Sequence, residues 1–212
     1  MGIAERRTRE KEELRAKIMD AATELFVQEG RESVSIRKIA EKIEYAPSTI
    51  YLYFDDKNKL LMTIVEETFE RLSAGLDEVA QRALPPVEAL FAGIRLYIQF
   101  GIDHPNQYYL AFCTIPDTDL PPESCQGVTE AALRALDHLR RALERCIEAG
   151  YIARQDTNVL TQSVWMMMHG LTSAVIFKDY DKGVPWASTE QLVEKTIEIL
   201  KGGLLTQVPS KN

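Results

Sequence analysis

The stretch APSTIYLYF, from Ala46 to Phe54, decides the fold because it can be read in two ways. Its residues from Thr49 onward are β-branched, aromatic or aliphatic, which is typical of a β-strand. A single strand in a helical chain would leave its backbone N–H and C=O groups without partners. Pro47 suits the first position of a helix, because its φ angle is fixed and its missing N–H is not needed there. We therefore predict a short helix after a tight turn at residues 44–46.

The rest of the chain has the apolar spacing of helices. Ile18, Ala22 and Phe26 lie on one stripe, and Gly30 is placed to end that helix. Ser35 is placed to cap the next helix. Further helices are expected over residues 57 to the eighties, 86–103, 105–114, 124–149, 156–178 and 187–203. The fold class predicted from this pattern is all-α.

Charge divides the chain into two parts. The net charge of −7 argues at first against nucleic acid, but residues 1–60 contain 12 basic and 12 acidic residues. The remaining residues contain 13 basic and 20 acidic residues, so the whole negative charge lies after residue 60. We expect the acidic part to avoid a phosphate backbone.

Cysteine usage and hydropathy favour a cytoplasmic protein. The three cysteines are odd in number and form no C-x-x-C pair, so we expect neither a disulfide framework nor a metal site. The basic N-terminal residues are followed by no apolar region, and we expect no secretory signal. Polar residues interrupt the apolar run from Val159 to Phe177, which indicates a buried helix rather than a membrane span. No cofactor is expected.

A helix-turn-helix gives the residues of the opening stretch a purpose. Its second helix enters the DNA major groove with its N-terminal part near base edges. Tyrosine and threonine hydroxyls can donate to phosphates, while their apolar parts pack or contact thymine methyl groups. The alternative is that these side chains fill a small core. We assign Phe54 to the core and leave both interpretations open for Tyr51 and Tyr53.

The stretch SVSIRKIAEKIEYAPSTIYLYFDDKNKLL, from Ser33 to Leu61, resembles the DNA-binding signature of TetR-family transcriptional repressors. The residues that match at unbroken spacing are Ser35, Arg37, Ile39, Ala40, Thr49, Tyr51, Tyr53, Phe54, Lys57 and Leu60. The sequence departs from the family pattern at Glu44, where a turn glycine is frequent, at Ala46, where a capping residue is frequent, and at Ser48.

The resemblance implies a double-stranded DNA operator as partner. By position, phosphate contacts fall to Ser35, Thr49, Tyr51, Tyr53 and Lys57. Lys57 would add its charge to the positive end of the helix that it begins. Arg37, Pro47 and Ser48 would face base edges, Arg37 with bidentate contact to guanine. The segment around Arg6, Arg7 and Arg9 either reaches a groove or is a solvated tail.

The C-terminal part resembles TetR-family effector domains that carry a Trp–His–Gly motif, here Trp165, His169 and Gly170. Large apolar side chains with a few polar groups are typical of small-molecule sites. The candidates for binding a small apolar effector are Phe91, Tyr97, Tyr108, Phe112, Trp165, Met168, His169 and Thr172. Each of them is equally compatible with a place in the core, and Gly170 beside His169 can instead mark tight helix packing. His104 is assigned to a helix end.

The helix expected over residues 156–178 is apolar on two faces and must therefore be buried on both. We expect one face to meet the domain core and the other to meet a second subunit, in a two-fold four-helix bundle. The residues predicted for this homodimer interface are Leu160, Val164, Met167, Leu171, Leu192, Thr196 and Leu200.

Together these observations predict a dimeric, ligand-responsive repressor. Residues 1–10 would be a tail, 11–56 the DNA-binding domain, 57–204 the effector-binding and dimerisation domain, and 205–212 a second tail. The chain lacks H-E-x-x-H, G-x-S-x-G and glycine-rich phosphate motifs, so we expect no enzyme. Two alternatives remain, a helical enzyme and a protein-interaction module that no longer binds DNA.

Overall fold

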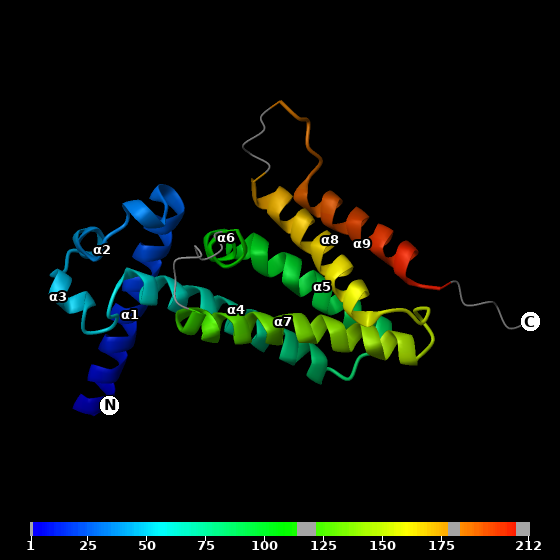
Figure 1. Ribbon diagram of the computed structural model, residues 1–212, viewed down its shortest axis with the longest axis horizontal. Coiled ribbons are helices and arrows are strands. Elements are labelled where there is room, and N and C mark those ends of the chain that lie inside the picture. Colours follow the sequence, from blue (N-terminus) through cyan, green and yellow to red (C-terminus); the bar gives the residue numbers. More distant parts are fainter. Residues whose placement is uncertain (1, 114–121, 178–182, 207–212) are drawn as a thin grey trace, which may run out of the picture. The chain divides into compact units, whose positions relative to one another are not determined.

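The computed structural model describes residues 2–113, 122–177 and 183–206, and the regular structure within these ranges is entirely helical (Figure 1). The predicted all-α fold is confirmed. The chain forms two compact units. Unit 1 comprises residues 1–69 and 106–130, and unit 2 comprises residues 70–105 and 131–212.

The helices follow the chain as the sequence predicted, with small differences at their ends. Unit 1 contains α1 (Ile3–Glu29), the 3-10 turn η1 (Arg31–Ser33), α2 (Ile36–Ile43), α3 (Pro47–Ile50) and α6 (Pro105–Phe112). Unit 2 contains α5 (Pro86–Asp103), α8 (Thr157–Phe177) and α9 (Thr189–Leu204). The long helices α4 (Lys57–Gln81) and α7 (Pro122–Glu148) contribute residues to both units.

The stretch from Ala46 to Phe54 is helical, as predicted. Pro47 occupies the first turn of α3, and the backbone N–H of Phe54 donates to the carbonyl of Ile50 at 3.0 Å. Ile50 and Phe54, four residues apart, are buried, whereas Tyr51 and Leu52 are exposed. Strand-like residues therefore form an amphipathic helical turn, and the assignment of Phe54 to the core is confirmed.

The turn between α2 and α3 has the geometry that the family pattern normally gives to glycine. Glu44 has φ 62° and ψ 41°, in the left-handed region. The N–H of Tyr45 donates to the carbonyl of Ala40 at 3.0 Å, which satisfies one of the free carbonyls at the end of α2. At the other end of α2, Ser35 accepts from the N–H of Lys38 at 3.2 Å, so its predicted capping role is confirmed.

Residues 3–10, predicted as part of a tail, are instead the first turns of α1. The N–H of Gly2 donates to the Glu5 carboxylate at 2.8 Å and closes the start of the helix. Ion pairs at i, i+4 spacing join Arg6 to Glu10 and, further along, Arg9 to Glu13. Such pairs each stabilise an exposed helix by about 0.2–0.5 kcal/mol.

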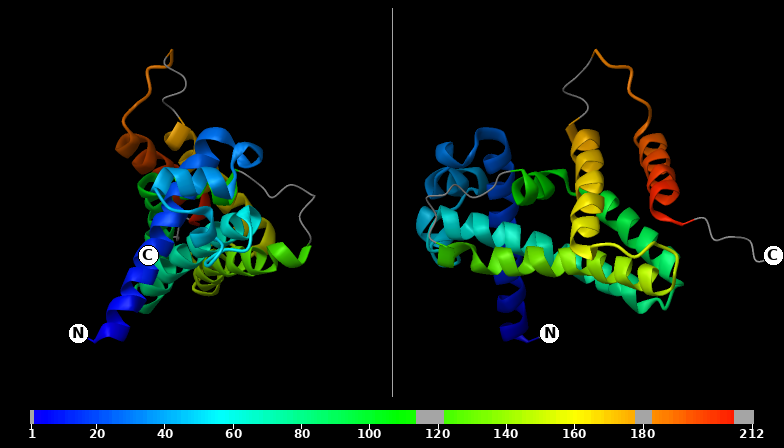
Figure 2. Two further views of the ribbon diagram at one scale, coloured as in Figure 1. Left: turned by 90° about the vertical axis from the view of Figure 1, so that its left-hand side faces the viewer. Right: turned by 45° about the vertical axis from the view of Figure 1, so that its right-hand side comes forward.

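In unit 2, α8 packs on α5 and on α9, and α8 and α9 lie side by side in Figure 1 and in the right-hand view of Figure 2. Two polar contacts join α5 to α9. Arg95 forms a two-pronged ion pair with Glu194, and the ammonium of Lys201 lies 5.0 Å from the centre of the Phe91 ring. Among the described residues, no helix is long and apolar enough to cross a membrane.

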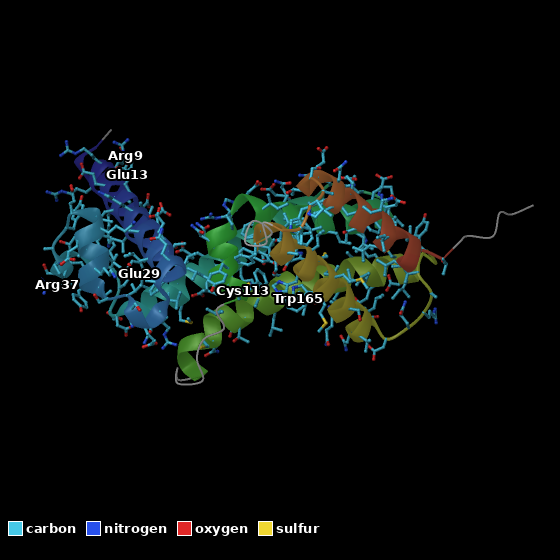
Figure 3. All side chains as sticks on the ribbon, turned by 90° about the horizontal axis from the view of Figure 1, so that it is seen from above. Arg9, Glu13, Glu29, Arg37, Cys113 and Trp165 are labelled. Atoms are coloured by element: carbon cyan, nitrogen blue, oxygen red, sulfur yellow. The ribbon has the colours of Figure 1, made fainter. Side chains whose placement is uncertain are left out.

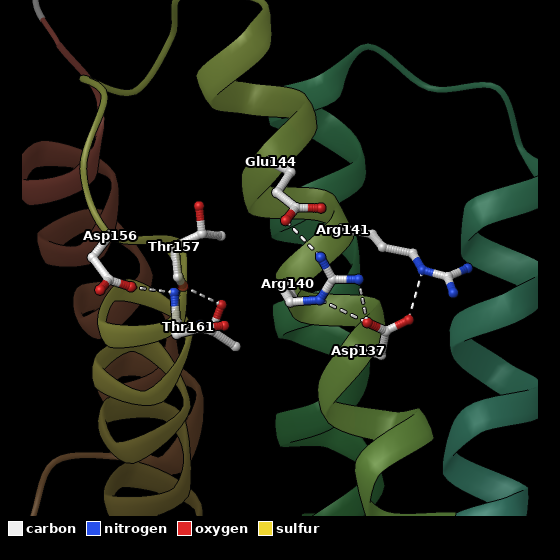
Figure 4. A network of polar contacts seen from close by, with 8 residues as sticks. Asp137, Arg140, Arg141, Glu144, Asp156, Thr157 and Thr161 are labelled. Carbon is white, nitrogen blue, oxygen red and sulfur yellow. Dashed lines mark hydrogen bonds and ion pairs between the residues drawn. The ribbon is translucent and has the colours of Figure 1, made fainter.

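Helix α7 carries a half-buried charged network along its length (Figure 4). Arg140 donates to Asp137 at 2.7 Å and to Glu144 at 2.5 Å, and Arg141 pairs with Asp137 at 2.6 Å. Burial raises the pKa of Asp137, but the hydrogen bonds and charges of the two arginines outweigh burial and hold the pKa below its ordinary value. These are ion pairs within one helix, so the network has a structural rather than a catalytic explanation.

The compact units are not divided at residue 56, where the sequence suggested a boundary between functions. Unit 1 continues to residue 69 and includes residues 106–130. Residue 206, expected in a tail, is attached to unit 2, since the N–H of Thr206 donates to the carbonyl of Tyr151 at 3.0 Å. Residues 207–212 lie outside the described residues. The functional boundaries stay a prediction.

Glu44→Gly should stabilise the protein. The left-handed conformation costs a residue with a Cβ about 1–2 kcal/mol, whereas the greater freedom of glycine in the unfolded chain costs about 0.4–1 kcal/mol. We expect the free energy of unfolding to rise by about 0.5–1 kcal/mol, measured by urea denaturation. Glu41→Gly, on the exposed side of α2, is the control and should destabilise by about 1 kcal/mol. A lower free energy of unfolding in Glu44→Gly than in the wild type would contradict the argument that the left-handed conformation strains Glu44.

Candidate nucleic-acid interface and effector region

Unit 1 brings all the residues predicted to contact DNA to its surface. They come from the start of α2 (Ser35, Arg37), from α3 (Pro47, Ser48, Thr49), from the turn after it (Tyr51, Tyr53) and from the start of α4 (Lys57). All of them are exposed or half-buried. The structure therefore leaves all of them accessible to a ligand, and their contacts to DNA stay predictions.

Arg37 has the freest side chain of the predicted base readers. Its side chain, labelled in Figure 3, is 82% exposed, and within the described part of the chain its ion pair is with Glu41, one helical turn away, at 3.2 Å. An exposed pair of this kind contributes little to stability, so Arg37 can exchange Glu41 for a DNA group at small cost. Tyr51 is 55% exposed, which leaves its hydroxyl available to phosphate.

The start of α4 differs from the expected anion site. Asp56 accepts from the N–H groups of Asn58 and Lys59 at 2.7 and 2.8 Å, so a carboxylate already occupies the positive end of this helix. The ammonium of Lys57 donates to the carbonyl of Arg31 at 2.9 Å. A phosphate at this position would have to displace these contacts.

Three cations from α1 lie over aromatic rings of the helix-turn-helix. Their distances from the ring centres are 6.0 Å for Lys11 over Tyr53, 5.6 Å for Arg15 over Phe54 and 5.3 Å for Lys17 over Tyr45. The sequence reading did not single out Lys11, Lys17 or Tyr45. The spacing pointed to Lys11 and Arg15, because these two residues share the helix face that continues to Ile18, whereas Lys17 lies off that face.

The predicted effector residues are divided between the two units. Tyr108 and Phe112 belong to unit 1, where their ring centres lie 4.6 Å apart and Phe112 meets Phe69 edge to face at 5.0 Å. The other six belong to unit 2: Phe91, Tyr97, Trp165, Met168, His169 and Thr172. The structure does not gather the full set within one unit, and their common role stays a prediction.

Within α8, the predicted effector residues differ in what they can offer a ligand. The ring of Trp165 stacks on His169, with centres 5.1 Å apart. Thr172 is fully buried and its hydroxyl donates to the carbonyl of Met168 at 2.8 Å, so Thr172 has a place in the helix core. Burial lowers the pKa of His169, which favours the neutral imidazole at neutral pH.

Two serine hydroxyls are candidates that the sequence reading missed. The Oγ atoms of Ser73 on α4 and Ser173 on α8 are buried and have no hydrogen-bond partner among the described residues. Other helical hydroxyls, such as those of Thr68 and Thr161, donate to the carbonyl four residues earlier. A buried hydroxyl without a partner costs about 1–3 kcal/mol, so each of the two serines is suited to a polar ligand group or water.

The structure corrects the predicted dimer face. Leu160, Val164 and Leu200 are buried by the chain itself and are not available to a partner. Met167 is 57% exposed, and Leu171, Leu192 and Thr196 are half-buried. The exposed face of α8 contains Val159, Ser163, Met166, Met167, Gly170 and Ala174. This uncharged face lies beside the face that carries Leu160 and Val164, with Met167 at the boundary between them.

Gly170 is open rather than tightly packed. A Cβ placed on it would meet no atom within 4 Å. The alternative that Gly170 marks tight packing inside the chain is therefore wrong.

Among the described residues, no group of three or more His, Cys, Asp or Glu side chains could hold a metal ion.

Comparison with protein families covers both parts of the chain. Residues 18–64 match the profile described as "Bacterial regulatory proteins, tetR family". Residues 90–200 match "Tetracyclin repressor-like, C-terminal domain", which by itself spans more than half of the chain. The Trp–His–Gly subtype stays a prediction.

Similar proteins are transcriptional regulators. The repressor KstR of Mycolicibacterium smegmatis is 35% identical over 78 residues, which is 37% of this chain and only 38% of KstR. The activator FasR of the same species is 22% identical over 202 residues, covering 92% of this chain and 84% of FasR. The fold is similar to that of Bacillus subtilis FadR in complex with stearoyl-CoA, with TM-score 0.75 and 22% identity over 89% of this chain and 98% of FadR.

Replacing His169 should reduce the loss of stability in mild acid. Because burial lowers its pKa from the ordinary 6.5, the folded state takes up a proton less readily than the unfolded chain. The stability from neutral His169 is fully present above the unfolded pKa and is lost as the pH falls below it. Between about pH 7.5 and about pH 5.5, the free energy of unfolding should fall more in the wild type than in His169→Gln. Equal losses in urea denaturation would contradict this.

Proposed function

The chain belongs to the TetR family of bacterial transcriptional regulators, and on that premise we propose that it is a cytoplasmic repressor. It binds a pseudo-palindromic operator as a homodimer and is released by a small, largely apolar effector. Members of this family regulate transcription and are not enzymes. The proposal thus sets aside both the helical enzyme and the interaction module.

The observation that carries the proposal is that the start of α3 is exposed while buried side chains fix the helix in place. Ile50 and Phe54 anchor the turn, while Pro47, Ser48 and Tyr51 face solvent. This is the arrangement that a recognition helix needs, because its N-terminal residues must reach base edges. Arg37 at the start of α2 adds an exposed guanidinium that can exchange Glu41 for guanine, and the hydroxyls of the turn bind phosphates.

A homodimer is supported by the exposed face of α8. Val159, Met166 and Met167 are 61%, 60% and 57% exposed, and this face carries no charge among the residues from Val159 to Ala174. Ile199, 66% exposed, adds apolar surface on the neighbouring helix α9. The small side chains of this α8 face let a second helix approach closely, and a contiguous exposed apolar surface indicates an interaction site. Covering it with a second copy gives the two-fold symmetry that an inverted-repeat operator requires.

An effector with a long apolar part and a hydrogen-bonding group fits the described residues. Phe91, Tyr97 and Met168 are apolar and buried, and Ser73 and Ser173 have buried hydroxyls without partners. The stearoyl-CoA of the FadR complex has an apolar chain of this kind, joined to a large charged CoA group. Release from DNA requires that the effector binds one arrangement of the dimer better than the other. Because α4 contributes to both units, a tilt of α4 is the proposed link.

The test is enrichment of operator sequences from a randomised duplex pool by the purified protein. We expect an inverted repeat that binds with steep salt dependence. The double variant Arg37→Ala/Tyr51→Phe should weaken operator binding. The loss of Arg37 should by itself account for about 1–3 kcal/mol of this decrease. Arg154→Ala with Tyr151→Phe, which makes the same chemical changes in unit 2, is the matched control. Stearoyl-CoA is then added to the bound complex and should lower operator affinity.

Each arm of this experiment can fail separately. Absence of any enriched sequence would overturn the proposal of a DNA-binding regulator, provided that denaturing the protein releases no co-purified ligand. Operator binding that stearoyl-CoA leaves unchanged would reject acyl-CoA as the effector. A promoter reporter distinguishes repression from activation. The comparison with FasR, which is named a transcriptional activator, makes this distinction necessary.

Met166→Glu should dissociate the dimer. In a two-fold interface the new carboxylate would be buried near its own symmetry mate, and burying a charge without a partner is costly. We expect monomers by light scattering and a loss of operator affinity. Leu133→Glu is the matched control, because Leu133 is similarly exposed (59%) but lies on the charged surface of α7. A dimeric Met166→Glu protein would show that the interface lies elsewhere.

A further inference from the structure

Helix α1 is longer than the core of unit 1 requires. It begins at Ile3, but its first buried residue is Ile18, and residues 4–13 are exposed. Ten residues correspond to about 15 Å of helix that gains nothing from packing. This part of α1, residues 4–13, is called the overhang.

Charges in the overhang are sorted by helix face. Arg7, Lys11 and Arg15 follow at i, i+4 and i+8, on the face that continues to Ile18. Like charges at this spacing destabilise a helix by about 0.2–0.5 kcal/mol per pair. A row of cations on one face is therefore a cost to the helix, which points to a role outside folding.

The opposite face of the overhang is neutralised internally. Arg6 pairs with Glu10 at 3.2 Å and Arg9 with Glu13 at 3.4 Å (Figure 3 labels the second pair). Arg7 and Lys11 form no ion pair with any described residue, whereas Arg15 is paired with Glu67 at 2.5 Å. Arg7 and Lys11 are thus the unneutralised cations of the overhang.

The cationic face is turned toward the recognition element. Lys11 lies 6.0 Å from the ring centre of Tyr53, and Arg15 lies 5.6 Å from that of Phe54. Arg7 lies one helical turn, about 5.4 Å, further along the same face. Tyr53 is among the residues predicted to contact phosphate, so the two cations continue that row of contacts beyond the helix-turn-helix.

We propose that Arg7 and Lys11 form a second phosphate-binding site, at which the overhang of α1 lies along the DNA backbone beside the recognition helix. The inference rests on the proposed function. The guanidinium of Arg7 suits two-pronged phosphate binding, and the ammonium of Lys11 acts as a point charge. Phosphate contacts carry no sequence information, so this site adds affinity and salt dependence and leaves operator preference unchanged.

The test compares two double variants of the full chain. Arg7→Ala/Lys11→Ala removes the cations of the exposed row, and Arg6→Ala/Arg9→Ala removes the same charge from the neutralised face. Alanine keeps the helix in both, and circular dichroism checks this. Operator affinity is measured between about 50 and 200 mM salt, with the duplex obtained by enrichment.

We expect the decrease of log affinity with log salt to become less steep by about 1.8 in Arg7→Ala/Lys11→Ala, which corresponds to two lost phosphate contacts. The Arg6→Ala/Arg9→Ala slope should stay close to that of the wild type. Equal slopes in the two double variants would overturn the inference, because the cations would then act only through net charge. A wild-type protein without salt-dependent operator binding would overturn the proposed function itself, which is a different outcome.

Discussion

The burial of Ile50 and Phe54 one helical turn apart is the constraint on which the DNA-binding surface depends. The backbone of this stretch can satisfy its hydrogen bonds only as a helical turn, because no strand lies beside it among the described residues. Once the two side chains are buried, the residues between them must face outward. Tyr51 and Leu52 are therefore exposed by the same geometry that anchors the turn.

The electrostatics of this surface differ from a simple positive patch. Asp56 satisfies the start of α4, and Lys57 is held by a backbone carbonyl, so an obvious anion site is already filled from within the chain. Exposed cations lie instead on α2, where Arg37 pairs with Glu41 at the surface, and on the face of α1 that meets the recognition element. Balanced charge over the first 60 residues thus conceals a segregated surface, because ion pairs along α1 neutralise one face and leave the other cationic.

Helix α8 combines three environments around one axis. One face, with Val164 and Met168, is buried by the chain itself. The second carries the stacked pair Trp165 and His169 at partial burial, where a ligand could replace solvent. The third face, which includes Met166 and Gly170, is uncharged and open. One helix thereby joins the core, the proposed effector region and the proposed partner surface.

Local pattern was enough for the all-helical fold, the helix positions, the family and the outward face of α3, because periodicity, Pro47 and the spacing from Ser35 to Leu60 act over short distances. Tertiary structure alone decided which faces are covered. The helix α8 is apolar on two faces, so its sequence could not tell that Leu160 and Val164 are internal while Met166 and Gly170 are open. The pairing of Lys11 with Tyr53 and of Arg15 with Glu67 likewise joins residues far apart in the chain. Burial and charge pairing of this kind depend on which surfaces meet after folding, and one-dimensional periodicity carries no record of that.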